Sequence, residues 1–153
     1  MLSKEELRDR VIRSIAATRF PFIDQTDWGD DYVTITNDGG RRMRGIMGPD
    51  GPVYPGIVIT RANTDIQEVG EVETEDTVTE ARVPEWRLMS EAAGAGRRTR
   101  KFFLYVPEGL EGVAERLLER NDIKYAGLRT WAIRDGGLVV APVKTPDDPK
   151  DHR

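Results

Sequence analysis

Helical segments separate the apolar, strand-like segments in the second half of this chain, and this order constrains the fold more than any other feature. Residues 66–74 and 101–106 predict strands, and the segment that begins at Pro84 between them predicts a helix. Residues 110–118 repeat their apolar positions at helical spacing, and residues 125–133 predict the next strand. Two strands that are joined through a helix are expected to be parallel neighbours. The sequence therefore predicts an α/β fold, a mixed β-sheet flanked by helices.

The first half of the chain adds one helix and several short strands. Residues 3–18 predict an amphipathic helix in which Ser3 and Glu6 form a capping box. Its apolar stripe at i, i+4 and i+8 consists of Leu7, Val11 and Ile15. Turns rich in glycine and proline delimit predicted strands at residues 32–36, 43–47 and 53–60, and the chain closes with an edge hairpin from 125–133 to 138–141.

Length and composition fit a single domain. The chain has 153 residues, of which 38% are hydrophobic and 33% are charged. We assign residues 1–143 to one α/β domain and expect the polar, proline-broken tail at 144–153 to be disordered. No apolar run approaches the roughly 18 residues that cross a bilayer, and the N-terminus lacks the apolar region of a signal peptide. We therefore expect a cytoplasmic protein without a membrane partner.

The absence of several residue types narrows the chemistry. The chain has no cysteine, so thiol nucleophiles, disulfides and cysteine-ligated zinc are excluded. Its one histidine, His152, lies next to the C-terminal residue, and none of its three serines stands in a Gly-x-Ser-x-Gly motif. Catalysis by this chain would have to rest on carboxylates, lysines or a metal.

The net charge of −4 argues against a protein that coats nucleic acids nonspecifically. The charges are distributed unevenly along the chain. Residues 62–81 contain seven acids and no lysine or arginine. Basic clusters lie elsewhere, at Arg41, Arg42 and Arg44 and at Arg97, Arg98, Arg100 and Lys101. One interpretation is a metal site beside segments that hold a polyanion, with the second cluster binding phosphates. The alternative is a solvated surface of alternating charge blocks.

Glu71 and Glu73 are the strongest candidates for chemistry. Residues spaced i, i+2 on a strand point to the same face, so the two carboxylates are expected to lie together. Paired carboxylates can hold a hard cation such as Mg²⁺ or Mn²⁺. The alternative is that both side chains line a solvated strand face.

The chain resembles the restriction-endonuclease-like superfamily, the PD-(D/E)xK nucleases, over residues 3–133. Tyr54-Pro55-Gly56-Ile57-Val58-Ile59 is similar to the strand that begins with a proline and an acidic residue, and Val69-Gly70-Glu71-Val72-Glu73 to the strand that carries (D/E)-x-K. The resemblance extends to the helix that carries Trp86 and to the strand at 102–106. It implies a restriction-endonuclease-like fold and a metal centre at Glu71 and Glu73.

Two positions depart from the superfamily pattern. Gly56 stands where the metal-binding aspartate is expected, and Glu73 stands in place of the lysine. Asp50 or Asp65 would supply the missing carboxylate only if its loop folded back over the strands. Lys101 is a candidate for the absent lysine.

Two functions follow as expectations. The first is a nuclease-like protein that acts on DNA phosphodiesters with Mg²⁺ or Mn²⁺ held by Glu71 and Glu73. The alternative is a catalytically inactive nuclease-fold protein that serves as a binding or assembly module. Trp86 is expected to anchor the core rather than to stack on a base, and Trp131 to cover a sheet face or a homodimer interface.

Overall fold

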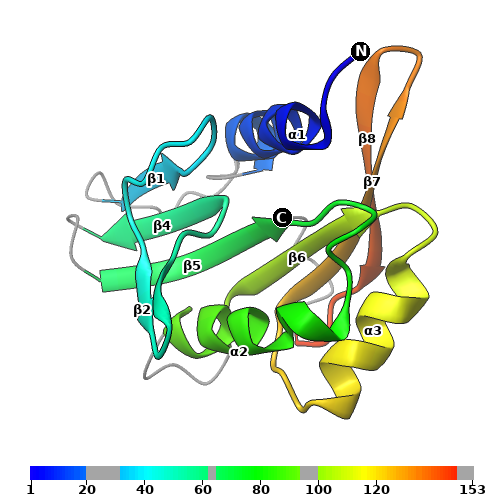
Figure 1. The fold of residues 1–153 in the computed structure, drawn as a ribbon. Coiled ribbons are helices and arrows are strands. Elements are labelled where there is room, and N and C mark those ends of the chain that lie inside the picture. Colours follow the sequence, from blue (N-terminus) through cyan, green and yellow to red (C-terminus); the bar gives the residue numbers. More distant parts are fainter. Residues whose placement is uncertain (20–31, 62–64, 94–99, 148–153) are drawn as a thin grey trace.

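The computed structural model describes residues 1–19, 32–61, 65–93 and 100–147, which form an α/β fold with a mixed six-stranded sheet (Figure 1). In chain order the elements are α1 (Lys4–Arg19), β1 (Tyr32–Thr36), β2 (Ile46–Gly48), β3 (Gly51–Val53), β4 (Ile57–Arg61), β5 (Asp65–Val72), the 3₁₀ helix η1 (Glu80–Arg82), α2 (Val83–Ala92), β6 (Phe102–Pro107), α3 (Glu111–Arg120), β7 (Gly127–Arg134) and β8 (Gly137–Lys144).

The order of strands in the sheet is β1-β4-β5-β6-β7-β8. β1, β4 and β5 are antiparallel neighbours, whereas β5, β6 and β7 are parallel, and β8 returns antiparallel at the edge. The helices α2 and α3 make the two crossovers between the parallel strands. The predicted mixed sheet with helix crossovers and an edge hairpin is therefore confirmed.

The helices cover both faces of the sheet, and β6 lies between the two cores. Helix α1 packs on one face, while α2 and α3 lie on the other (Figure 1). Successive residues of β6 alternate between these cores, as a strand of period two requires: Phe102, Leu104 and Val106 face α2 and α3, and Phe103 and Tyr105 face α1. This burial on both faces explains why 101–106 is the most hydrophobic stretch of the sequence.

The predicted N-terminal helix is confirmed together with its cap. Ser3 and Glu6 exchange the two hydrogen bonds of a capping box, Ser3 N–H to Glu6 Oε2 at 2.7 Å and Glu6 N–H to Ser3 Oγ at 3.1 Å. Val11 and Ile15 of the predicted stripe are fully buried. Helix α1 is thereby fixed over β4, β5 and β6, where Arg8 reaches the end of β5.

The region between β1 and β4 differs from the expectation. The strand predicted at 43–47 begins only at Ile46, and it pairs with β3 in a separate two-stranded hairpin. The segment predicted as one strand at 53–60 is divided, because Pro55 and Gly56 interrupt it between β3 and β4. At the other end of the chain, β8 continues to Lys144, whose Nζ lies 2.5 Å from Glu119 Oε1.

Some expectations lie outside the described residues. They concern Arg97 and Arg98 and the tail residues from 148 onward, including His152. In the part of the chain that the structure describes, no helix has the length and apolar character that crossing a membrane would need.

Candidate functional site

The end of β5 carries the two glutamates that the sequence singled out. Glu71 lies near the end of β5, where it pairs with Leu104 of β6. Glu73 follows the last residue of the strand, and its N–H donates to the Tyr105 carbonyl at 2.9 Å. Arg82 contacts both carboxylates, so they lie on one side as predicted. Each residue is only 1% exposed. The alternative of a solvated strand face is therefore wrong.

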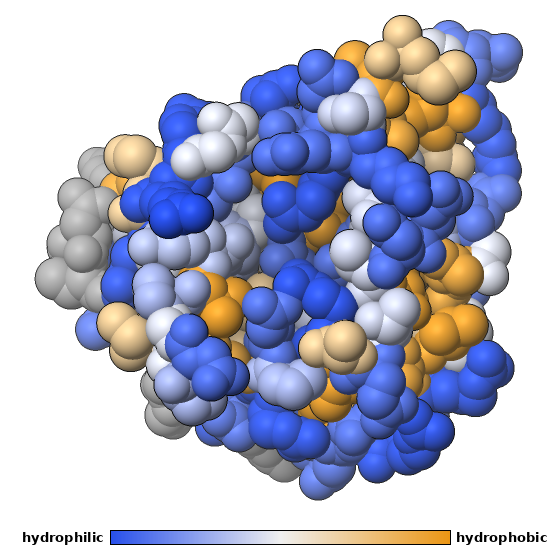
Figure 2. All heavy atoms as spheres, viewed as in Figure 1, coloured by the Kyte–Doolittle hydropathy of each residue, from blue (hydrophilic) through white to orange (hydrophobic). Residues whose placement is uncertain are grey.

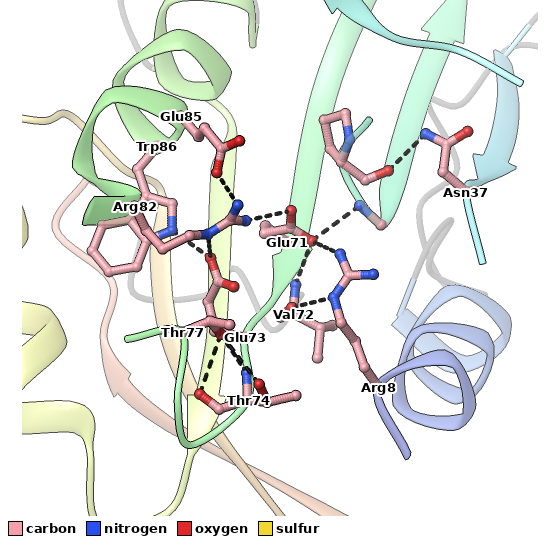
Figure 3. A network of polar contacts seen from close by, with 12 residues as sticks. Arg8, Asn37, Glu71, Val72, Glu73, Thr74, Thr77, Arg82, Glu85 and Trp86 are labelled. Atoms are coloured by element: carbon pink, nitrogen blue, oxygen red, sulfur yellow. Dashed lines mark hydrogen bonds and ion pairs between the residues drawn. The ribbon is translucent and has the colours of Figure 1, made fainter. Parts of the chain in front are cut away.

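Glu71 is held by donors from three directions (Figure 3). Its Oε1 accepts hydrogen bonds from Arg8 Nη2 at 2.5 Å, from the Gly56 N–H at 3.1 Å and from the Val72 N–H at 2.9 Å. Its Oε2 lies 3.2 Å from Arg82 Nη2. One oxygen of this carboxylate is thus saturated with donors from the protein itself.

Glu73 is bound through both its side chain and its backbone. Its Oε2 accepts from Arg82 Nε at 3.0 Å and from the Trp86 indole N–H at 2.6 Å, while its carbonyl accepts from the Trp131 indole N–H at 3.0 Å. Both tryptophans are buried. Trp86 anchors the core as expected, and Trp131 covers the sheet face under α1.

Arg82 lies at the centre of these contacts, at the end of η1 and one residue before α2 (Figure 3). Its guanidinium binds the carboxylates of Glu71 and Glu73 and also pairs with Glu85 in the first turn of α2. Arg8 binds Glu71 from α1, and its Nε donates to the Val72 carbonyl at 2.8 Å. We call these five charged side chains the arginine–glutamate network.

The electrostatics of the network follow from burial and from neighbouring charges. Burial raises the pKa of Glu73, the charge of Glu71 raises it further, and Arg82 and the Trp86 indole oppose both effects. Burial alone would lower the pKa of Arg8, but its ion pair with Glu71 outweighs burial and raises it. The charged form of Glu73 is therefore favoured by Arg82 against the effects of burial and of the neighbouring Glu71 charge.

Gly56, at the position of the expected aspartate, packs too tightly to carry a side chain. A Cβ there would come within 2.9 Å of Ile12 Cδ1 and Cγ1, and within 3.2 Å of Glu71 Oε1. The space that the motif carboxylate would need is filled by α1. Gly56 contributes its backbone N–H to Glu71 instead.

The two aspartates considered as substitutes for that carboxylate lie elsewhere. Asp65 begins β5, six residues from Glu71, which corresponds to roughly 20 Å along an extended strand. Asp50 is in the turn between β2 and β3 and lines a different pocket, between that hairpin and α2. Neither aspartate lines the pocket at Glu71 and Glu73.

The predicted basic residues are not brought to this pocket by the described part of the chain. Arg97 and Arg98 lie outside the described residues. Arg100 donates to the Glu91 carbonyl, and Lys101 directly precedes β6, at the end of the sheet opposite to Glu73. Lys101 therefore does not take the place of the motif lysine. The cations at the carboxylates are Arg8 and Arg82, which sequence reasoning missed.

A signal for Arg82 was present in the sequence. Arg82 is the first basic residue after the acidic segment 62–81, and a buried acid within that segment requires a nearby cation. Nothing in the sequence pointed to Arg8, which is 63 residues from Glu71.

The network lines an open pocket of about 260 Å³. Its wall consists of Arg8, Pro52, Val53, Tyr54, Glu71, Glu73, Thr77, Arg82 and Glu85. Three carboxylates and two guanidiniums leave this lining with one net negative charge. Among the described residues no group of three or more acidic, histidine or cysteine side chains is arranged to hold a metal ion. As the side chains lie, the carboxylates do not fit a divalent cation, because guanidinium nitrogens contact the oxygens that would bind it.

The arrangement can do two things chemically. It joins α1, β5 and α2 through buried charge-assisted hydrogen bonds, and it presents a polar pocket at the end of the parallel strands.

Comparison with protein-family models, with curated proteins and with solved structures finds no match to this chain.

Proposed function

We propose that this protein is a nuclease-fold module that binds a partner instead of cleaving phosphodiesters, with the arginine–glutamate network in the place of a metal centre. The order of elements supports the nuclease-like part of this proposal. A helix, three antiparallel strands, a second helix and a parallel strand occur in the order that the resemblance implies, with the β2–β3 hairpin inserted between β1 and β4. Glu71 also lies beside the start of β4, since Gly70 pairs with Ile57.

The observation that carries the proposal is the position of Arg82. Its guanidinium contacts the carboxylates of Glu71, Glu73 and Glu85. A side chain of the protein thus supplies the positive charge that a metal ion would supply in a nuclease centre. A divalent cation would have to displace a guanidinium that is only about a quarter exposed. Displacement would also leave that charge without its partners, which is costly in a partly buried site.

The tight packing at Gly56 supports the same proposal. A third carboxylate at the motif position would collide with Ile12. Two carboxylates without a third protein ligand make a weak site for Mg²⁺ or Mn²⁺ unless water or substrate completes the coordination. The module is therefore expected to lack appreciable divalent-metal affinity.

A second candidate is a Mg²⁺- or Mn²⁺-dependent nuclease that acts on DNA. It is favoured by the placement of Arg82 on a single 3₁₀ turn at the border of an open pocket, from which the side chain could swing outward. Tyr54 lines the same pocket, and Arg42 Cζ lies 5.7 Å from the centre of its ring, which places one further cation near the pocket for contact with a phosphate backbone.

Calorimetry with Mn²⁺ and Mg²⁺, alongside cleavage assays on single- and double-stranded DNA, separates the two candidates. For a binding module we expect neither metal binding nor cleavage by the wild type, and none from Glu71→Ala. Metal binding and cleavage by the wild type that both vanish in Glu71→Ala would instead establish the nuclease. Glu80→Ala is the matched control, since this exposed acid pairs with Arg120 outside the pocket.

A further inference from the structure

A second, more apolar pocket lies between the β2–β3 hairpin and α2. Its volume is about 460 Å³, within the range of pockets that hold ligands or side chains of a partner. Its apolar walls come from both elements, and they consist of Pro49, Pro52, Val53, Val83, Pro84 and Leu88. Gly48 allows the close approach of the two elements, because a Cβ there would lie 3.0 Å from Leu88 Cδ2. We call this the hairpin pocket.

An exposed methionine stands beside the hairpin pocket on the same hairpin. Met47 pairs across the strands with Pro52, which lines the pocket, and 75% of Met47 is exposed. Met43, shortly before β2, is 67% exposed. Methionine is flexible and polarizable and is used at adaptable binding surfaces. On the face shown in Figure 2 most of the surface is hydrophilic, and apolar atoms form small patches, one of them over this hairpin.

The charges around these features are complementary. Three acids, Asp50, Glu85 and Glu91, line the hairpin pocket together with one cation, Arg87. Arg42 lies next to Met43 on the segment that leads into β2 and stacks on Tyr54. A surface that presents a methionine beside an arginine thus adjoins a pocket whose apolar walls lie beside three carboxylates.

From these observations we propose that the hairpin pocket is the docking site for a second copy of this chain, with Met47 of each copy inserted into the pocket of the other. A protruding side chain and its receptor on one hairpin are self-complementary, so a two-fold axis closes the contact after two copies. In that arrangement Arg42 of each copy faces the acidic rim of its partner. The proposal deepens the assembly function and rests on it, but no metal or nucleic acid enters its test.

Sedimentation velocity of the full chain between about 1 and 500 µM tests the association, since this range brackets a dimer of micromolar affinity. We expect a concentration-dependent dimer that Met47→Asp and Asp50→Arg each weaken by at least about tenfold, as charged or mismatched groups at the centre of a contact do. Met47 and Asp50 are both exposed, and circular dichroism checks that each variant is folded. Val139→Asp is the matched control, because this exposed valine lies on β8, away from the hairpin.

Cross-linking tests the geometry itself. The chain has no cysteine, so single cysteines report on one contact only. We expect a short bismaleimide to link Met47→Cys of one copy to a tagged Glu91→Cys copy, and not to link Met47→Cys to a tagged Val139→Cys copy.

A wild type that stays monomeric over the whole range, a Met47→Asp variant that dimerises unchanged, or a dimer lost in Val139→Asp would overturn the proposal. Metal binding and cleavage that vanish in Glu71→Ala would refute the binding-module function, whereas sedimentation and cross-linking alone decide the dimer, so the two failures are distinguishable.

Discussion

Replacing Arg82 with methionine tests the arginine–glutamate network most directly. Methionine keeps much of the length of the side chain but removes the charge and all its donors. The carboxylate of Glu73 then keeps only the Trp86 indole, while Glu71 keeps Arg8 and two backbone N–H groups. Both carboxylates stay buried, so the loss of the shared cation is not compensated by water.

The expected cost follows from burial. Removal of one partner from a fully buried ion pair costs about 3–5 kcal/mol. Arg82 itself is 24% exposed, and Glu71 retains a second arginine, so the cost is expected at or just below the lower end of this range. We expect a loss of about 2–3 kcal/mol in the free energy of unfolding at pH 7. For a chain of this size the midpoint of thermal unfolding should fall by roughly 4–12 °C.

The loss should also depend on pH. Arg82 lowers the pKa of Glu73 against the effect of burial, so its removal raises that pKa further. A group whose pKa is higher in the folded state stabilises the fold when it is protonated, and this contribution is lost as pH rises through the folded pKa. The deficit of Arg82→Met relative to the wild type should therefore be largest at neutral pH and should shrink as pH falls towards the ordinary range of glutamate.

Urea unfolding followed by tryptophan fluorescence at pH 7 and pH 5 measures both effects. Arg120→Met is the matched control, since Arg120 and its partner Glu80 are both about two-thirds exposed. That control should lose at most about 1 kcal/mol, at either pH. If Arg82→Met were as stable as this control at pH 7, or if its deficit did not change with pH, the network would not have the energetic role argued for it.

Three further predictions concern single positions. Gly56→Asp should fail to create metal affinity and should destabilise the fold by about 1–3 kcal/mol or more, because its side chain would overlap Ile12; calorimetry and urea unfolding measure both. Trp86→Phe should cost about 1.5–3 kcal/mol in the same unfolding assay, because the Glu73 carboxylate loses the indole N–H. Burial raises the pKa of Asp38, but hydrogen bonds from Thr36 and two arginines outweigh burial and lower it to about 2. Asp38→Asn should therefore lose roughly 2 kcal/mol at neutral pH, and the difference from the wild type should disappear as pH falls from about 4 to 2.

A control variant and two contradicting outcomes distinguish these effects from a general loss of stability on mutation. Gly112→Ala lies within α3, where the nearest atom to a new Cβ is Arg116 Nη1 at 3.6 Å, so it should stabilise the helix by about 0.5–1 kcal/mol. A Gly56→Asp protein that bound Mn²⁺ and kept its stability would show that α1 moves to admit the carboxylate. For Asp38→Asn, a deficit that persisted at pH 2 would mean that the charge of Asp38 is not its source.

The sequence was most informative where one property repeats along the chain. The spacing of Leu7, Val11 and Ile15 predicted α1, and the apolar run at 101–106 predicted a strand, which the structure buries on both faces. It was least informative where backbone interruptions decide the outcome. Pro55 and Gly56 separate β3 from β4, so that residues 53–60 contribute to two different sheets instead of forming one strand.

The candidate site shows a different limit. The spacing of Glu71 and Glu73 predicted that they share a face, because strand geometry is local. Their partners come from α1 and from the turn before α2, and that placement depends on how the helices cross the sheet. A buried carboxylate needs either a metal or a fixed cation, and the two alternatives share the same strand motif. The residues that distinguish them are Gly56, whose missing side chain leaves room for Ile12, and Arg82, whose guanidinium fills the centre of the acidic group. If the proposed function holds, a glycine at the position of Gly56 together with an arginine at the position of Arg82 is the sequence pattern that indicates a fixed cation in place of a metal.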